Sequence, residues 1–150
     1  MSRSQALYDQ AIMAHNRQPR NFREMPDATH AVEGNNSLCG DRFTVFVKMD
    51  GDRIADVSFK GRGCAIAKAS ASIMTATVLG ETAKEARALF LAFHTMVNGD
   101  PDAPVDEEEL GESVALATVR SFPVRIKCAT LPWHILLAAL DGKDGVISTE

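Results

Sequence analysis

The clearest pattern in the sequence is an alternation of apolar and polar side chains in two neighbouring segments, residues 42–49 and 54–60. A period of two is typical of a strand with one buried face. Asp50-Gly51, between the segments, favours a tight hairpin turn. The pattern therefore predicts an antiparallel hairpin, with residues 29–33 as a candidate third strand. The positions predicted to face the core are Phe43, Val45, Val47 and Met49 in the first segment and Ala55, Val57 and Phe59 in the second.

After Gly63 the apolar positions recur about every 3.6 residues, which indicates helices. Gly80 suits the end of the first of these helices, and Thr82 begins a capping box that starts the next. The last helix is expected to begin at Thr130, with Pro132 in its first turn. The predicted helical ranges are 4–16, 65–79, 82–97, 113–119 and 130–140.

This order of elements predicts an α+β fold, in which a small antiparallel sheet of about three strands packs against several helices on one face. The chain has 150 residues, of which 45% are hydrophobic, and it shows no internal repeat. A length of this order argues for a single domain, residues 1–150. The segments 1–4 and 142–150 are expected to be flexible.

The charge balance excludes several classes of function. The sequence has 16 basic and 20 acidic residues and a formal net charge of −4, so nothing indicates binding to nucleic acid or to an anionic membrane. No apolar run approaches the ~20 residues of a membrane span, and the first residues do not resemble a signal peptide, so a cytoplasmic protein is expected. The acidic segment 100–112 is predicted to be a solvated loop with a short helix, with a role in partner binding left open.

The three cysteines, Cys39, Cys64 and Cys128, are candidates for chemistry. An odd number without a secretion signal argues against a disulfide framework. All three fall at predicted element junctions, and Cys64 and Cys128 precede predicted helices, whose N-termini stabilise a thiolate. Asp41 adds a carboxylate two residues after Cys39, and three thiolates with one carboxylate form a suitable four-coordinate set for Zn²⁺. The alternative is that the cysteines are small buried apolar residues and that Asp41 caps a turn.

A zinc site with these four ligands carries a net charge of −2 and favours cations nearby. Arg42, Arg125 and Lys127 adjoin the candidate ligands in the sequence, although each is equally consistent with ordinary surface charge. The four histidines show no metal-binding spacing and are not needed as ligands.

Three long segments around the cysteines resemble the motifs of SufU proteins, the SUF-pathway branch of the IscU-like (NifU N-terminal domain) family of iron–sulfur cluster assembly. The resemblance covers about residues 5–140. Lys127 stands where IscU-type scaffolds carry a His directly before the third cysteine, and residues 90–122 resemble the longer connection of SufU proteins. The matching segments are 36–42 (NSLCGDR), 61–75 (GRGCAIAKASASIMT) and 125–133 (RIKCATLPW), supported by Leu7-Tyr8, Ile12-Met13, His15 and Pro19-Arg20-Asn21.

The resemblance implies an IscU/SufU-like fold and one Zn²⁺ bound by Cys39, Asp41, Cys64 and Cys128. It also implies a sulfurtransferase, in which Cys39 accepts persulfide sulfur from a SufS-type cysteine desulfurase and passes it on to a SufBCD-type scaffold complex. Arg125 matches a basic residue associated with engaging the desulfurase. Two alternatives stay open: a scaffold that assembles a [2Fe–2S] cluster on the same ligands, and a small domain with structural zinc only.

Overall fold

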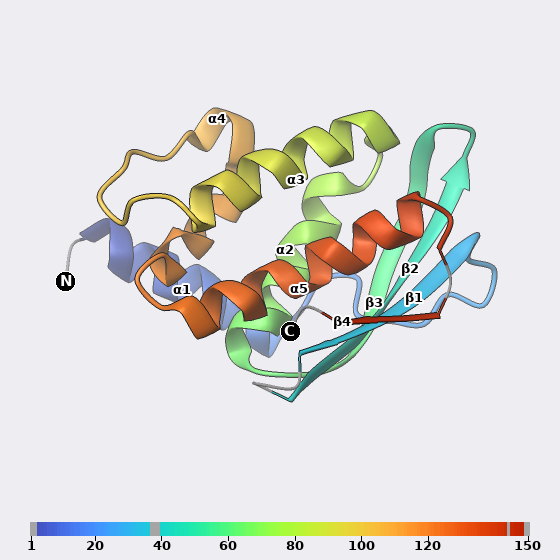
Figure 1. Cartoon of the computed structure of the whole chain (residues 1–150), viewed down its shortest axis with the longest axis horizontal. Helices are drawn as coiled ribbons and strands as arrows, with labels where there is room; N and C mark the ends of the chain where they lie inside the picture. Colours follow the sequence, from blue (N-terminus) through green and yellow to red (C-terminus); the bar gives the residue numbers. More distant parts are fainter. Residues whose placement is uncertain (1–2, 37–39, 144, 149–150) are drawn as a thin grey trace.

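The computed structural model describes residues 3–36, 40–143 and 145–148, and it has the predicted α+β architecture (Figure 1). A sheet lies at one end of the molecule, and helices cover one of its faces. In chain order the elements are α1 (Arg3–Arg17), β1 (His30–Asn36), β2 (Asp41–Asp50), β3 (Arg53–Arg62), α2 (Ala65–Val78), α3 (Ala83–Val97), α4 (Glu107–Leu110), the 3₁₀ helix η1 (Gly111–Val119), α5 (Pro123–Leu140) and β4 (Gly145–Ser148).

The sheet has the strand order β3-β2-β1-β4. The pairs β1–β2 and β2–β3 are antiparallel, which confirms the predicted three-stranded meander. The fourth strand was not predicted, because the segment from residue 142 onward was expected to be flexible. Strand β4 instead pairs in parallel with β1, with Val32 opposite Gly145. Four residues are too few to show an alternating pattern in the sequence.

The hairpin of β2 and β3 contains an irregularity that the sequence pattern did not reveal. Lys48 lies opposite Asp56 but Met49 lies opposite Ile54, so Ala55 is an additional residue in β3. A β-bulge of this kind exchanges the faces of the residues on either side of it. Ile54 is therefore buried, whereas Ala55 is exposed and the prediction that it faces the core was wrong.

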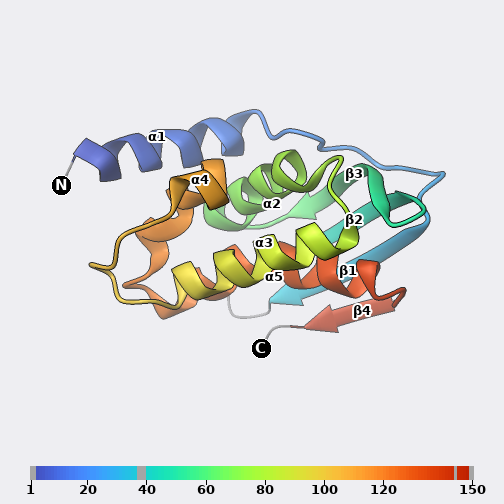
Figure 2. The same cartoon turned by 90° about the horizontal axis from the view of Figure 1, so that it is seen from above.

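Helices α2 and α5 pack on the buried face of the sheet, where α5 contacts β1 and β2 and α2 contacts β3. Helix α1 lies over α2 and η1, and α3 adds a further layer on the far side of α5 (Figure 2). Helix α2 is enclosed on most sides, which explains why nine of its residues are buried although the sequence suggested a single apolar stripe. The largest side chains of this shared core include Trp133, Phe43, Phe59, Phe93 and Ile73.

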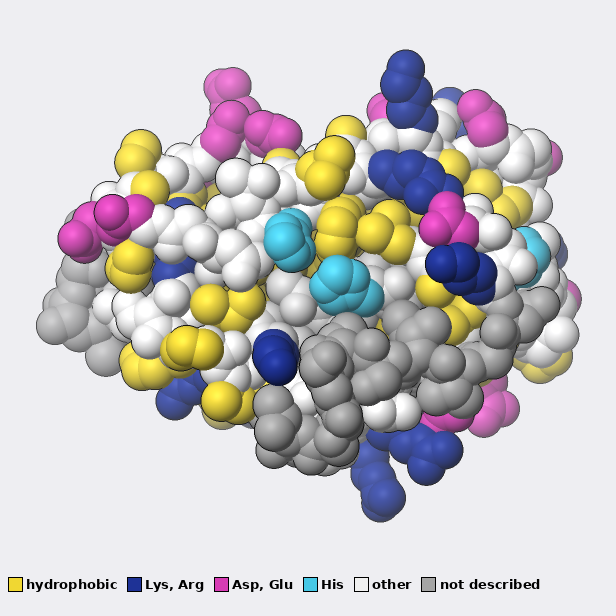
Figure 3. Space-filling view, viewed as in Figure 1, with side chains coloured by type: hydrophobic (Ala, Val, Ile, Leu, Met, Phe, Trp, Pro, Cys, Tyr) yellow, Lys and Arg dark blue, Asp and Glu magenta, His cyan; other side chains and the backbone are white. Residues whose placement is uncertain are grey.

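The predicted helix ends are confirmed for α2 and α3. Gly80 follows α2 with a φ of 85°, and the Thr82–Glu85 capping box is formed with both of its hydrogen bonds. The segment that contains residues 113–119 is a 3₁₀ helix, and α4 confirms the short acidic helix expected within residues 100–112. Figure 3 shows acidic side chains gathered over α4.

The expected start of the last helix was wrong. Helix α5 begins at Pro123, seven residues before Thr130, and Pro123 occupies the first helical turn, where a missing N–H is tolerated. Pro132 consequently lies inside the helix rather than in its first turn, and Cys128 is a helical residue rather than one that precedes the helix. Among the described residues, no helix is long and apolar enough to cross a membrane.

Candidate metal site

Asp41, the first residue of β2, is a carboxylate directed into the protein. It follows the alternation of the strand, so its side chain lies on the same face as Phe43, and the residue is only 1% exposed. The Oδ1 atom accepts a hydrogen bond from the backbone N–H of Cys64 at 2.8 Å. A buried carboxylate requires such partners. With Oδ1 bonded to the backbone, Oδ2, which lies 3.9 Å from Cys64 Sγ, is the oxygen that can bind a metal ion.

Cys64 is the N-cap residue of α2. Its backbone is extended and its Sγ accepts a hydrogen bond from the N–H of Ala67 at 3.4 Å. The unpaired N–H groups at a helix start favour negative charge, so this position suits a thiolate. The prediction that Cys64 lies at the start of a helix is therefore confirmed, whereas its role as a metal ligand stays a prediction.

Cys128 reaches the same region from α5 and is 2% exposed. Because α5 begins five residues earlier, the expectation that Cys128 gains from a helix N-terminus was wrong. Its place in the site comes from the packing of α5 against α2 and the sheet.

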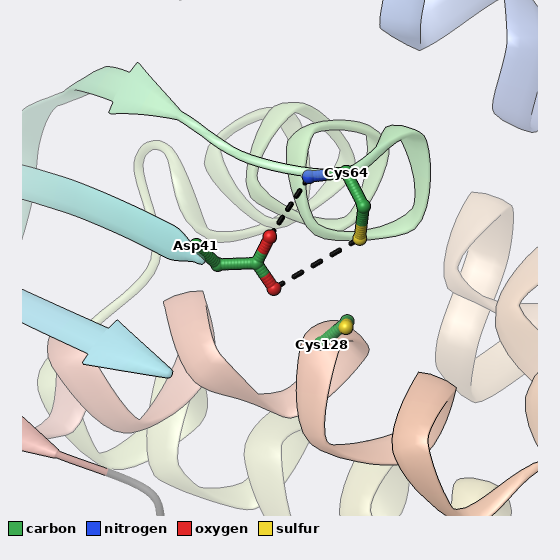
Figure 4. A group of neighbouring side chains, drawn as sticks. All are labelled: Asp41, Cys64 and Cys128. Carbon is green, nitrogen blue, oxygen red and sulfur yellow. Dashed lines mark hydrogen bonds between the residues drawn. The ribbon is translucent and has the colours of Figure 1, made fainter. Parts of the chain in front are cut away.

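The three side chains point toward one another from three different elements (Figure 4). The potential ligand atoms of Asp41, Cys64 and Cys128 all lie within 4.8 Å of one another, and Cys64 Sγ is 3.9 Å from Asp41 Oδ2. Tetrahedral Zn²⁺ with Zn–S bonds of ~2.3 Å and a Zn–O bond of ~2.1 Å places sulfur and oxygen about 3.6 Å apart. The three donors therefore fit zinc in type and in spacing, with one coordination position left for a fourth ligand.

The pKa of the Cys64 thiol is lowered to about 7. The largest cause is a hydrogen bond with the side chain of Cys128, and the N–H of Ala67 acts in the same direction. Burial and the negative charge of Asp41 oppose this shift. The site thus stabilises a thiolate at neutral pH, which is the form that binds metals and attacks sulfur.

Two glycines before Cys64 allow the loop to pass close to β2. A Cβ atom at Gly63 would lie 2.6 Å from Asp41 Oδ1 and 2.8 Å from the ring of Phe43. A Cβ atom at Gly61 would lie 2.2 Å from the carbonyl oxygen of Arg42. No local pattern in the sequence indicates this requirement, because it follows from a contact between distant segments.

The cations expected beside the site differ in their contacts. Arg42 forms an ion pair with Glu33, and the Arg125 guanidinium lies 4.4 Å from the centre of the Phe122 ring. Lys127 is half-buried and forms no ion pair with the described side chains. That Arg42, Arg125 and Lys127 balance the negative charge of the metal site stays a prediction.

Cys39, the expected sulfur acceptor and fourth metal ligand, lies outside the described residues. The described chain resumes at Gly40, directly before Asp41. The assignment of Cys39 as a ligand and acceptor therefore stays a prediction.

A second polar cluster lies between α1, α2 and η1 and was not predicted. His15 is 5% exposed, and its ring nitrogens lie 2.7 Å from Ser72 Oγ and 2.7 Å from Glu112 Oε2. Arg20 completes the cluster with an ion pair to Glu112 at 2.8 Å. His15 and Arg20 belong to the N-terminal segment that resembles SufU, which was the only signal for this cluster in the sequence.

Comparison with known proteins agrees with this fold. The family model described as "NifU-like N terminal domain" matches residues 7–129. The chain belongs to this family. A relative named zinc-dependent sulfurtransferase SufU, from Bacillus subtilis, is 41% identical over 140 residues, which cover 93% of this chain and 92% of the relative.

Other relatives carry the name of a scaffold. The iron–sulfur cluster assembly scaffold protein IscU of Streptococcus pyogenes is also 41% identical, covering 93% of this chain and 86% of the relative. A crystal structure described as a putative iron–sulfur cluster assembly scaffold protein for the SUF system, from Fervidobacterium islandicum, superposes with a TM-score of 0.82 at 35% identity. That superposition covers 90% of this chain and 97% of the other. The similar proteins therefore include some that are named as sulfurtransferases and others that are named as scaffolds, and sequence similarity alone does not distinguish the two functions.

Proposed function

We propose that this protein is a zinc-dependent sulfur-transfer protein of iron–sulfur cluster assembly. It works as a single cytoplasmic domain that accepts sulfur from a SufS-type cysteine desulfurase and passes it to a SufBCD-type scaffold complex. The observation that carries this proposal is the convergence of Asp41, Cys64 and Cys128, whose ligand atoms lie within 4.8 Å of one another. Similarity to a relative named as a zinc-dependent sulfurtransferase supports it.

In this function Cys39 supplies the fourth metal ligand and accepts the sulfur. Bound Zn²⁺ keeps its cysteine ligands deprotonated at neutral pH. In the transfer, the Cys39 thiolate attacks the outer sulfur of the cysteine persulfide on the desulfurase. The bond between the two sulfur atoms of the donor breaks, the donor cysteine leaves as a thiolate, and Cys39 becomes the persulfide.

The described residues have distinct tasks in this proposal. The N–H of Cys64 orients the carboxylate of Asp41, and the Cys128 thiol lowers the pKa of Cys64. Arg125 is exposed at the start of α5, one helical turn before Cys128, where it engages the desulfurase. An exposed guanidinium suits recognition of a carboxylate on a partner.

The test combines metal analysis with a transfer assay. Protein purified without chelators is expected to hold about one zinc per chain and no iron. With a SufS-type desulfurase and cysteine, it is expected to stimulate alanine release and to gain one sulfur atom on the peptide that contains Cys39. The Cys39→Ala variant is expected to lose both, and full stimulation by this variant would exclude Cys39 as the acceptor.

The second candidate is a scaffold for a [2Fe–2S] cluster, because thiolates also bind such clusters and a relative of equal identity is named as a scaffold. Two observations favour zinc: the carboxylate of Asp41 within the donor set, and Lys127 directly before Cys128. Near-stoichiometric iron and sulfide with a brown chromophore in the purified protein would favour the scaffold.

A further inference from the structure

On the side of the candidate metal site formed by β3 and the start of α2, three cations have no carboxylate partner among the side chains that the structure describes: Lys60, Arg62 and Lys68. We call these three residues the basic cluster. Farther along β2 and β3, Lys48 forms an ion pair with Asp27, and Asp56 forms one with Arg23. The basic cluster thus places positive charge without a carboxylate partner on the part of this surface that adjoins the site.

The basic cluster is a continuous surface. Lys60 and Lys68 both lie over the ring of Phe22, with Nζ 4.4 Å and 5.0 Å from its centre. Lys60 and Arg62 also line one hollow of about 340 Å³ together with Arg42 and Glu33. Lys60 therefore connects a lysine on α2 with an arginine at the end of β3.

The backbone fixes this cluster next to the metal ligands. Arg62 lies two residues before Cys64, and the N–H of Lys68 donates to the Cys64 carbonyl at 3.1 Å, one helical turn later. Arg62 also lies directly opposite Arg42, which follows Asp41. Any protein that reaches Cys64 along this side of the molecule contacts the basic cluster.

The arrangement is electrostatically unfavourable in the isolated chain. Like charges directly opposite one another in an antiparallel pair are destabilising, and Arg42 and Arg62 form such a pair. Glu33 neutralises Arg42 but leaves Arg62 unbalanced. An acidic surface from another protein, placed over Lys60, Arg62 and Lys68, removes this repulsion.

We propose that the basic cluster is the docking surface for an acidic patch on the protein that donates sulfur to this site. This inference rests on the proposed function and adds the side of the molecule on which the donor binds and the charge that it presents there. Complementary charge mainly accelerates encounter and fixes orientation. Both effects suit sulfur transfer, because the two proteins must associate and dissociate in every cycle.

The experiment measures how the rate of a SufS-type desulfurase depends on the concentration of this protein. The variant Lys60→Glu/Arg62→Glu/Lys68→Glu is expected to raise the half-saturating concentration at least about tenfold, or about 1.4 kcal/mol of binding free energy. The maximal rate should remain, because no metal ligand is changed. Raising the salt concentration should raise the half-saturating concentration of the wild type more steeply than that of the variant.

Lys84→Glu is the matched control, since Lys84 is an exposed cation in the first turn of α3 and has no ion pair with the described side chains. It is expected to leave the half-saturating concentration unchanged. The milder variants Lys60→Gln and Arg62→Gln test the proposal even if the triple variant misfolds. Their half-saturating concentrations should lie between those of the wild type and the triple variant. Zinc content and the thermal midpoint are measured for every variant.

Two results would overturn the inference, and they are distinguishable from failure of the proposed function. If the wild type stimulates the desulfurase and the Gln variants and triple variant match Lys84→Glu, sulfur transfer stands and the basic cluster is not the docking surface. If zinc affinity falls while half-saturation stays constant, the three cations balance the charge of the metal site instead. If the wild type itself gives no stimulation, both proposals fail.

Discussion

The carboxylate of Asp41 accepts a 2.8 Å hydrogen bond from the backbone N–H of Cys64, which ties the first residue of β2 to the N-cap of α2. This bond orients one candidate ligand by means of the backbone of another. It also places the negative charge of Asp41 close to the Cys64 thiol. This charge raises the pKa of the thiol, whereas the hydrogen bond with Cys128 lowers it.

The substitution Asp41→Asn separates these two roles. The amide oxygen can still accept the Cys64 N–H bond, but the negative charge is lost. We expect zinc affinity to fall by about tenfold or more, because an amide is a weaker ligand than a carboxylate. Competition with a chelator of known affinity measures this loss, and unchanged affinity would remove Asp41 from the ligand set.

The same variant has an expected pH signature in metal-free protein. Alkylation of Cys64 follows its thiolate fraction, so in the wild type it should reach half of its maximal rate near pH 7, given that the pKa is lowered to about 7. Because the charge of Asp41 raises this pKa, Asp41→Asn should shift the midpoint to lower pH. Mass spectrometry of the Cys64 peptide separates its reaction from that of Cys128, and a shift to higher pH would contradict the assignment.

The close approach of Gly63 to Asp41 predicts a sensitive position. In Gly63→Ala the new Cβ atom would lie 2.6 Å from Asp41 Oδ1, so the carboxylate must move away from the Cys64 N–H. We expect a clear loss of zinc affinity together with some loss of stability. Gly51→Ala is the control: Gly51 has a φ of 63° and no neighbour within 4 Å of an added Cβ, so backbone strain alone should lower stability there without changing zinc affinity.

Local patterns predicted those parts of the fold that depend on neighbouring residues. The hairpin, the capping box at Thr82 and the N-cap position of Cys64 follow from periodicity and from side chains three or fewer residues away. The predicted start of α5 at Thr130 was wrong because Pro132 was placed in the first helical turn, although that place is taken by Pro123. Cys128 consequently lies inside the helix rather than before it.

The candidate metal site likewise has some features that neighbouring residues predict and others that depend on distant segments. The type of side chain and its position at predicted element junctions indicated which residues could bind zinc, and the structure brings together Asp41, Cys64 and Cys128. The requirement for glycine at position 63 arises from a segment that is 22 residues away in the sequence, so no local pattern contains it. The same holds for the hydrogen bond between His15 and Glu112, which are 97 residues apart.

That His15–Glu112 contact predicts a pH-dependent contribution to stability. The hydrogen bond with His15, and then Arg20, holds the pKa of Glu112 below its ordinary value of 4.5. A carboxylate with a depressed pKa stabilises the fold above that ordinary value, and the contribution is lost as the pH falls through the folded-state pKa.

The substitution Glu112→Ala should lower the free energy of unfolding at pH 7 by about 1–2 kcal/mol, since the buried His15 ring loses a partner. Urea unfolding of metal-free protein at pH 7 and at acidic pH measures the effect, and the difference between wild type and variant should shrink at acidic pH. Glu108→Ala, at an exposed glutamate of α4, is the control and should change stability by less than about 0.5 kcal/mol. A difference independent of pH would show that Glu112 does not act through its charge.

Arg120, directly after η1, holds the acidic segment by its shape as well as its charge. Its Nε donates to the Met96 carbonyl at 3.1 Å, and one terminal nitrogen lies 2.7 Å from the Ala103 carbonyl, with Asp100 and Pro101 also within reach. A lysine cannot reproduce this planar set of donors.

Arg120→Lys and Arg120→Met should therefore both cost about 1–3 kcal/mol of stability, and both should accelerate hydrogen exchange at residues 100–105. Sulfur transfer should continue at the wild-type maximal rate, because none of these contacts reaches the three metal ligands. Full rescue of the exchange protection by lysine would show that charge alone holds the segment.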